Sequence, residues 1–203
     1  MQATETGQNQ SEMMPMMTCS PRIGTLGPIG TSSEQAALFY SKTILPWYLK
    51  SSIHLFPTFE EVLESLLSEK INECVVPHAF KNINIFYINK HTNLHAIFRF
   101  STPEYGLAYS KGKRPKFDDH VRIATHHAPR HLADDRTLVP WEKITIVDAP
   151  STSIAAKMLV DGDCDLAITN ASALSNYGDD VEFLSSFGQI DMGWSVFTKR
   201  SLK

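Results

Sequence analysis

Short apolar segments alternate with helical segments along most of this sequence, and no other feature constrains the fold as strongly. Segments with the length and composition of buried strands occupy residues 23–26, 52–56, 74–77, 121–125, 144–147, 165–169 and 194–197. Residues 94–109 form two further extended pieces, broken near 101–103. Helical spacing and start signals predict helices at residues 33–45, 59–68, 152–160 and 171–177, and another that begins at Pro129. Repeated strand-helix-strand units predict an α/β fold with mainly parallel sheets and right-handed crossovers.

The carboxyl ends of these strands are where a ligand is expected. In open α/β sheets, ligands lie in the crevice outside the carboxyl ends of the parallel strands. Applied to this sequence, the rule selects four stretches, which are residues 27–33, 77–80, 125–127 and 169–170. A functional site is expected to draw its side chains from them.

Size and composition allow one large domain or two small lobes. The chain has 203 residues, of which 42% are hydrophobic and 20% charged, as in ordinary globular proteins. Residues 1–20 follow neither the strand period nor the helix period, so a disordered tail is expected there. The alternative is a methionine-rich docking strip, which Pro15 disfavours because it interrupts any helix.

Charge and cysteine content exclude several classes of partner. The chain has 19 Lys and Arg against 22 Asp and Glu, a net charge of −3 with no basic stripe, so no nucleic-acid partner is expected. Three cysteines without a CxxC pair favour a reduced, cytoplasmic protein. No apolar run approaches the length of a membrane span, and no secretory signal is present, so no membrane partner is expected either. An anionic ligand would need positive charge supplied locally.

The stretch Gly30 to Ser33 places hydroxyls and free backbone N–H groups at the start of a predicted helix. The helix dipole favours a carboxylate at such a position, so Thr31, Ser32 and Ser33 are candidate anion ligands. A serine cap without a ligand is the alternative. The nearby glycines have GxxGxxG spacing and no lysine follows, so neither a dinucleotide site nor a P-loop is indicated.

Two histidines and one arginine are candidate acids or cations. His78 and His126 each follow a predicted strand, so both are expected at the ligand edge of a sheet, although His78 also fits a hydrogen-bonded structural role. Arg99 lies in an apolar run and must either face an anion or lie on the solvent face of an edge strand.

No metal site and no covalent nucleophile are expected. Four histidines cluster within twelve residues, but Pro129 prevents a continuous i, i+4 pair of ligands, and no HExxH motif is present. There is no GxSxG elbow and no cysteine in a recognisable catalytic signature.

Residues 25–37 read TLGPIGTSSEQAA, which resembles the TLGPxGTxSxxAA opening of the prephenate dehydratases. The similarity continues through residues 76–77, 151–156, 165–168 and 177–178, and so covers about residues 22–199. The resemblance implies a two-lobed α/β fold of the periplasmic-binding-protein type II kind, with prephenate in the cleft between the lobes. It implies one lobe of residues 21–100 and 186–203 and a second lobe of residues 101–185.

Two departures from the dehydratase pattern point to a subgroup. Where dehydratases have VPIENS this chain has VPHAFK, and where they have the catalytic TRF it has Ser195, Val196 and Phe197. With Phe98-Arg99 and residues 102–106, these changes resemble the non-hydroxyl-expelling prephenate decarboxylases of bacilysin-type and aeruginosin-type pathways. Only six residues follow Phe197, so a regulatory ACT domain is not expected.

The resemblance also implies roles for individual residues. Thr31, Ser32 and Ser33 would hold one carboxylate of prephenate, and Arg99 or His78 would supply the cation for the pyruvyl end. The catalytic candidates are His78 and His126 as proton donors, with bound water as the alternative, and Ser195 at the altered TRF position. Candidates for contact with the ring hydroxyl are Thr102, Tyr105, Thr169 and Asn170.

The expected reaction is decarboxylation without aromatisation. No cofactor is needed, because the diene of the substrate accepts the electrons that decarboxylation releases. Two alternatives stay open, an ordinary dehydratase and a non-catalytic ligand-binding module on the same fold. The sequence also leaves open whether the chain forms a homo-oligomer.

Overall fold

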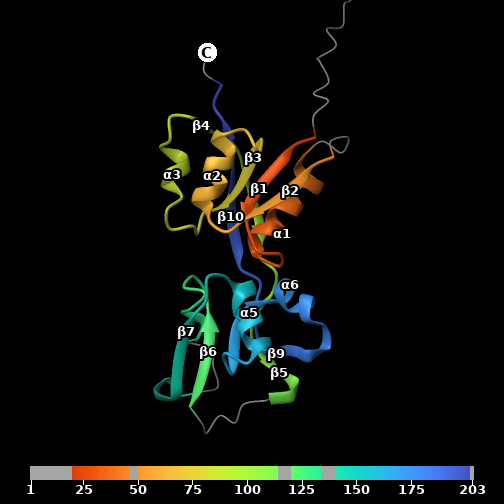
Figure 1. Ribbon diagram of the computed structural model, residues 1–203, viewed down its shortest axis with the longest axis vertical. Helices are drawn as coiled ribbons and strands as arrows, with labels where there is room; N and C mark the ends of the chain where they lie inside the picture. Colours follow the sequence, from red (N-terminus) through yellow and green to blue (C-terminus); the bar gives the residue numbers. More distant parts are fainter. Residues whose placement is uncertain (1–19, 46–49, 114–119, 134–139, 202–203) are drawn as a thin grey trace, which may run out of the picture.

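The computed structural model describes residues 20–45, 50–113, 120–133 and 140–201. These residues form two five-stranded sheets, each covered by helices (Figure 1). The expected tail lies outside the described residues except for Ser20. The helix expected to begin at Pro129 is described only as far as Ala133, and this part begins with a turn.

The first sheet has the strand order β2-β1-β3-β10-β4. Its strands are β1 (Arg22–Leu26), β2 (Ser52–Phe56), β3 (Glu73–Pro77), β4 (Thr92–Ser101) and β10 (Asp191–Lys199). Its helices are α1 (Ser32–Phe39), which continues as the π-helix η1 (Tyr40–Ile44), then α2 (Phe59–Leu67) and α3 (Asn84–Tyr87). Apolar side chains pack on both faces of this sheet, in one cluster around Tyr40 and Trp194 and another around Phe86 and Phe197.

The second sheet has the order β7-β6-β8-β5-β9. Its strands are β5 (Tyr105–Ser110), β6 (Val121–Thr125), β7 (Ile144–Asp148), β8 (Leu166–Asn170) and β9 (Val181–Gly188). Its helices are α5 (Thr152–Asp161) and α6 (Ala171–Leu174), with the 3-10 turns η2 (Lys111–Lys113), η3 (Trp141–Lys143) and η4 (Ser175–Asp180). None of the helices in the described part of the chain is long and apolar enough to cross a membrane.

The expectation of mainly parallel sheets is wrong, because half of the strand pairs in each sheet are antiparallel. In the first sheet β10 runs against both β3 and β4, and in the second β5 runs against both β8 and β9. The reason is that β5 and β10 arrive directly from the other sheet, without a crossover helix to turn them parallel. The chain passes between the sheets after Ser101 and again after Gly188 (Figure 1).

Thr102 fastens these two passages together. Its backbone N–H donates to the carbonyl oxygen of Ile190 at 2.9 Å, and its Oγ1 accepts from the N–H of Ile190 at 3.1 Å. Thr102 is completely buried, so it has a structural place at the junction between the two sheets.

Candidate functional site

A cavity of about 340 Å³ opens where the carboxyl ends of strands from both sheets face each other. Its walls come from the segments that follow β1, β3, β6 and β7, together with the start of α2 and of β10. The residues that line it include Thr31, Ser32, Ser33, Thr58, Phe59, Glu60, Phe80, Lys81, Tyr105, His126, His127, Ser151, Thr152, Met192 and Trp194. Three of the four stretches selected by the strand-end rule therefore contribute to this cavity.

Three helices begin at the cavity. The hydroxyl of Thr31 accepts from the N–H of Glu34 at 3.2 Å and caps α1, and Thr58 caps α2 in the same way through Glu61, also at 3.2 Å. Ser151 caps α5 by accepting from the N–H of Ile154 at 3.1 Å. A helix N-terminus carries partial positive charge. The cavity is therefore electropositive from both sheets, and Glu60 in the first turn of α2 is the acidic side chain at its rim.

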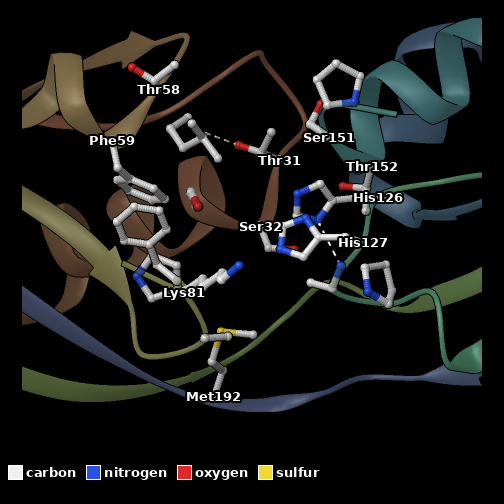
Figure 2. A pocket seen from close by; sticks show the side chains of 18 of the residues that line it. Thr31, Ser32, Thr58, Phe59, Lys81, His126, His127, Ser151, Thr152 and Met192 are labelled. Atoms are coloured by element: carbon white, nitrogen blue, oxygen red, sulfur yellow. Dashed lines mark hydrogen bonds between the residues drawn. The ribbon is translucent and has the colours of Figure 1, made fainter. Parts of the chain in front are cut away.

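Lys81 adds a full positive charge to the cavity. It is the one Lys or Arg among the described residues that line the wall, and Figure 2 shows its side chain reaching in from the side opposite the histidines. It follows β3 four residues after the strand ends at Pro77. The stretch 77–80 selected from the sequence stopped one residue short of it.

His126 and His127 lie on the other wall, with ring centroids 4.0 Å apart. Burial, together with the neighbouring His127 ring, lowers the pKa of His126 to about 4. The Nδ1 atom of His126 accepts from the backbone N–H of Ala128 at 3.3 Å, which leaves the proton of the neutral ring on Nε2. At neutral pH, His126 is thus an uncharged hydrogen-bond donor.

Hydroxyl groups line the floor between the starts of α1 and α5. The hydroxyls of Ser32 and Tyr105 lie 3.1 Å apart, and Asn170 donates to the Oγ1 of Thr152 at 3.1 Å. Burial raises the pKa of Tyr105, and hydrogen bonds from Ser32, Thr152 and Asn170 only partly offset this. Tyr105 therefore stays a neutral phenol.

An apolar wall completes the cavity. The rings of Phe59 and Phe80 lie 4.5 Å apart, and Met192 and Trp194 line the side formed by β10. These four side chains come from three separate segments of the chain, and no spacing in the sequence links them. A ring-shaped ligand would contact an apolar surface here and hydrogen-bonding groups on the opposite side.

Ser195 and His78 come together, but not in the cavity. The Oγ of Ser195 lies 2.9 Å from the Nε2 of His78 and 2.6 Å from the hydroxyl of Tyr87. Successive residues of a strand point to opposite faces, so Trp194 lines the cavity while Ser195 faces α3. His78 is exposed and is absent from the cavity wall, although Pro77 and Ala79 belong to it.

Arg99 lies away from the cavity. Its side chain is 75% exposed and forms an ion pair with Asp191, on the solvent face of β4 at the edge of the first sheet. Of the two placements left open by the sequence, this is the edge-strand one. The geometry gives no support to Arg99 as a carboxylate ligand, whereas Lys81 does line the cavity.

Thr169 and Asn170 stand behind the cavity wall. The Oγ1 of Thr169 donates to the carbonyl oxygen of Thr152 at 2.8 Å, and the side chain of Asn170 caps α6 while holding Thr152. Both are completely buried. They orient Thr152, which begins the helix predicted at residues 152–160 and itself lines the cavity.

Within the described residues, no three His, Cys, Asp or Glu side chains are grouped so that they could hold a metal ion. Two of the four clustered histidines have other partners, since His120 contacts the hydroxyl of Thr145 at 2.7 Å and His131 contacts the carbonyl oxygen of Ala128 at 3.1 Å.

The chain is similar in sequence to several characterised proteins, although no family model matches it. It is 37% identical over 182 residues to a prephenate decarboxylase from Planktothrix agardhii, covering 88% of each chain. It is 39% identical over 184 residues to a prephenate decarboxylase from Bacillus amyloliquefaciens, covering 87% of this chain and 86% of the other.

Solved structures share the fold at much lower identity. A prephenate dehydratase from Arthrobacter aurescens, in complex with L-Phe, superposes with a TM-score of 0.66 at 15% identity, over 89% of this chain and 61% of that one. A periplasmic substrate-binding protein of an ABC transporter from Coxiella burnetii superposes with a TM-score of 0.55 at 17% identity, over 88% and 84% of the two chains. The expected two-lobed α/β architecture is confirmed by these neighbours.

Proposed function

The chain belongs to the prephenate decarboxylase family, and from this premise we propose that it removes carbon dioxide from prephenate while the ring keeps its hydroxyl. The product is 3-(4-hydroxycyclohexa-1,5-dienyl)-2-oxopropanoate, a dihydro-4-hydroxyphenylpyruvate. The family premise rests on 37% and 39% identity over seven-eighths of the chain.

One observation about the cavity carries the proposal, namely that helix N-termini from both sheets converge on it beside Lys81. Prephenate has two carboxylates, one on a ring carbon and one at the end of the pyruvyl side chain of that same carbon, and a chain with a net charge of −3 must neutralise them locally. The start of α1 is proposed to hold one carboxylate and the start of α5 the other, with Lys81 as the mobile counter-ion.

Carbon dioxide loss breaks the bond between the ring carbon and its carboxylate. The electron pair of that bond moves into the ring diene, a proton is added at a distant ring carbon, and the carbon–oxygen bond of the hydroxyl stays intact. The apolar wall of Phe59, Phe80 and Trp194 is proposed to pack against the ring and to exclude water from the reacting carbon, which favours release of the neutral carbon dioxide. The chemistry needs no cofactor, because the diene accepts the electrons.

We assign proton delivery to the His126 and His127 pair. Both line the cavity, and the exposed ring of His127, once protonated from solvent, can give its proton to the ring carbon and return to the neutral form, while the neutral ring of His126 donates a hydrogen bond from Nε2. His78 is less suited to this role, because its Nε2 contacts Ser195 outside the cavity. Retention of the ring hydroxyl requires that no acid reach it, which favours water-poor surroundings for that group.

We further propose a cytoplasmic enzyme that supplies a precursor for antibiotic or non-ribosomal peptide biosynthesis. This part of the proposal rests on the resemblance of residues 98–106 and 195–197 to the decarboxylases of such pathways.

Incubation of the purified chain with prephenate tests the proposal. The expected products are carbon dioxide and a non-aromatic keto acid, identified by mass and by proton NMR. Phenylpyruvate, detected by the ultraviolet band of its enolate in alkali, would identify a dehydratase instead. Binding of prephenate without release of carbon dioxide would identify a ligand-binding module.

A further inference from the structure

The phenol of Tyr105 lies where the two sheets meet at the floor of the cavity. Tyr105 is the first residue of β5, directly after the first passage between the sheets, and it is only 7% exposed. On one side its hydroxyl lies 3.1 Å from the Oγ of Ser32, in the first turn of α1. The contact joins the second sheet to the helix that begins in the first.

On its other side the same hydroxyl meets the start of α5. Thr152 is the first residue of α5 and Asn170 the last of β8, their side chains are hydrogen-bonded to each other at 3.1 Å, and both lower the pKa of Tyr105. Asn170 is also the strand partner of Tyr105, so the backbone pairing sets its place beside the ring. The hydroxyl is thus surrounded by side chains that are fixed by two helix starts and one strand end.

We propose that Tyr105 is a positioning residue that sets the spacing between the start of α1 and the start of α5, and so selects ligands with two carboxylates. This inference rests on the proposed function, in which each helix start holds one carboxylate. The hydroxyl of Tyr105 already contacts the Oγ of Ser32 at 3.1 Å, and we therefore assign it to positioning and not to direct contact with the ring hydroxyl of the substrate.

A second contact shows that α1 and the second sheet are fitted to each other at close range. A methyl group added to Gly30 would come within 2.9 Å of the Cα of Ala173 in α6. The loop before α1 thus rests on α6 while Ser32 contacts Tyr105. Rigid spacing matters because binding at two sites gains most when both are already at the right distance.

Tyr105→Phe removes the hydroxyl and keeps the ring, and Tyr109→Phe is its matched control. Tyr109 lies in the same strand, is also 7% exposed, and donates its hydroxyl to Glu182, away from the cavity. The readouts are KM and kcat with prephenate, the inhibition constant of phenylpyruvate, which has one carboxylate, and calorimetric binding of both compounds. Thermal unfolding of both variants reports on the fold.

For Tyr105→Phe we expect prephenate affinity to fall about three- to tenfold, the range of one net hydrogen bond, and phenylpyruvate affinity to change less than about twofold. Tyr109→Phe should change neither. In the double variant Ser32→Ala/Tyr105→Phe the losses should not add, since both changes remove one link. If Tyr105→Phe does not fold, Ser32→Ala alone should lower the affinity for prephenate more than the affinity for phenylpyruvate.

An equal loss of affinity for prephenate and for phenylpyruvate would overturn the inference, because Tyr105 would then be an ordinary contact of one carboxylate. Unchanged prephenate affinity would overturn it as well. The proposed function fails separately, if the wild-type chain binds prephenate but releases no carbon dioxide. In that case the ratio of the affinities for prephenate and phenylpyruvate, measured by calorimetry, still decides the role of Tyr105.

Discussion

At the scale of single residues, Lys81 is the cation in the cavity wall, and its charge is open to a direct test. Lys81→Met keeps most of the length of the side chain and removes its charge. We expect KM for prephenate to rise about fivefold, a modest factor because the side chain is exposed and screened by salt. Raising the salt concentration should weaken prephenate binding to the wild type more than to the variant. Lys42→Met, on an exposed lysine outside the cavity, should change neither value.

His126 gives a prediction for the pH dependence of stability. Its pKa falls from 6.5 to about 4 on folding, because burial disfavours the charged ring. The unfolded chain therefore binds more protons between these values, and stability should drop as the pH falls from 6.5 to 4. His126→Gln, measured by urea unfolding at pH 7.5, 6 and 5, should lose less stability over this interval. His95→Gln, on the exposed surface of β4, should keep the wild-type slope, and equal slopes for all three proteins would contradict the assignment.

The site could be predicted from sequence only where a local rule applies. Thr31, Ser32 and Ser33 were found because a helix cap after a strand is a local pattern, and they do line the cavity. Ser195 was selected by alignment with TRF, yet strand alternation turns it to the other face and leaves Trp194 at the cavity. Which face of β10 meets the ligand depends on its pairing with distant strands, which the local sequence does not record.

At the scale of elements, two substitutions at the N-cap of α5 can separate what a helix start contributes to stability from what its positive charge contributes to ligand binding. Ser151→Ala removes the cap bond to Ile154 and should cost about 1 kcal/mol of stability, with a small rise in KM. Ser151→Asp keeps a cap but places a negative charge at the cavity. It should retain stability within about 0.5 kcal/mol while KM rises about tenfold or more. Chemical unfolding and initial rates measure the two effects.

Prephenate binding by Ser151→Asp decides whether the start of α5 holds a carboxylate. If Ser151→Asp binds prephenate as well as the wild type does, the start of α5 does not hold a carboxylate. The same result would require the second carboxylate to bind elsewhere, with Lys81 and the start of α1 as the remaining positive groups.

Elements with their own start and stop signals were predicted well. The helix predicted at residues 59–68 matches α2, whose start has a capping box of Thr58 and Glu61, and the strands predicted at 52–56 and 121–125 match β2 and β6. By contrast, β9 was missed, because its Ser185, Ser186 and Gly188 have the composition of a loop. It forms a strand because β5 offers it a partner, and such pairing is a tertiary effect. The four residues of α3 have no cap that a sequence could reveal.

At the scale of the whole molecule, the cavity exists only because two sheets present their ligand edges to each other. Each sheet contributes a capped helix start, and Tyr105 and the loop before α1 bridge the gap. The chain crosses between the sheets after Ser101 and after Gly188, where Thr102 and Ile190 are hydrogen-bonded. The relative placement of the sheets should therefore control affinity more than it controls the stability of either sheet.

Gly30 tests this coupling at the contact between the two halves. It has a φ of +88°, and a Cβ there would lie 2.9 Å from the Cα of Ala173. Gly178 is the matched control, because its φ is +60° and a Cβ there would meet nothing within 4 Å. Both Gly→Ala changes should cost about 1 kcal/mol through backbone strain.

Only Gly30→Ala should also push the loop before α1 away from α6. We therefore expect prephenate affinity to fall at least about fivefold in Gly30→Ala and to stay within about twofold of wild type in Gly178→Ala, and the contact with α6 adds to the loss of stability in Gly30→Ala alone. Denaturant unfolding and calorimetry measure the two quantities on each variant. If both variants bind prephenate equally well, the two sheets do not need to be held this closely, and the cavity must adjust its width when the ligand binds.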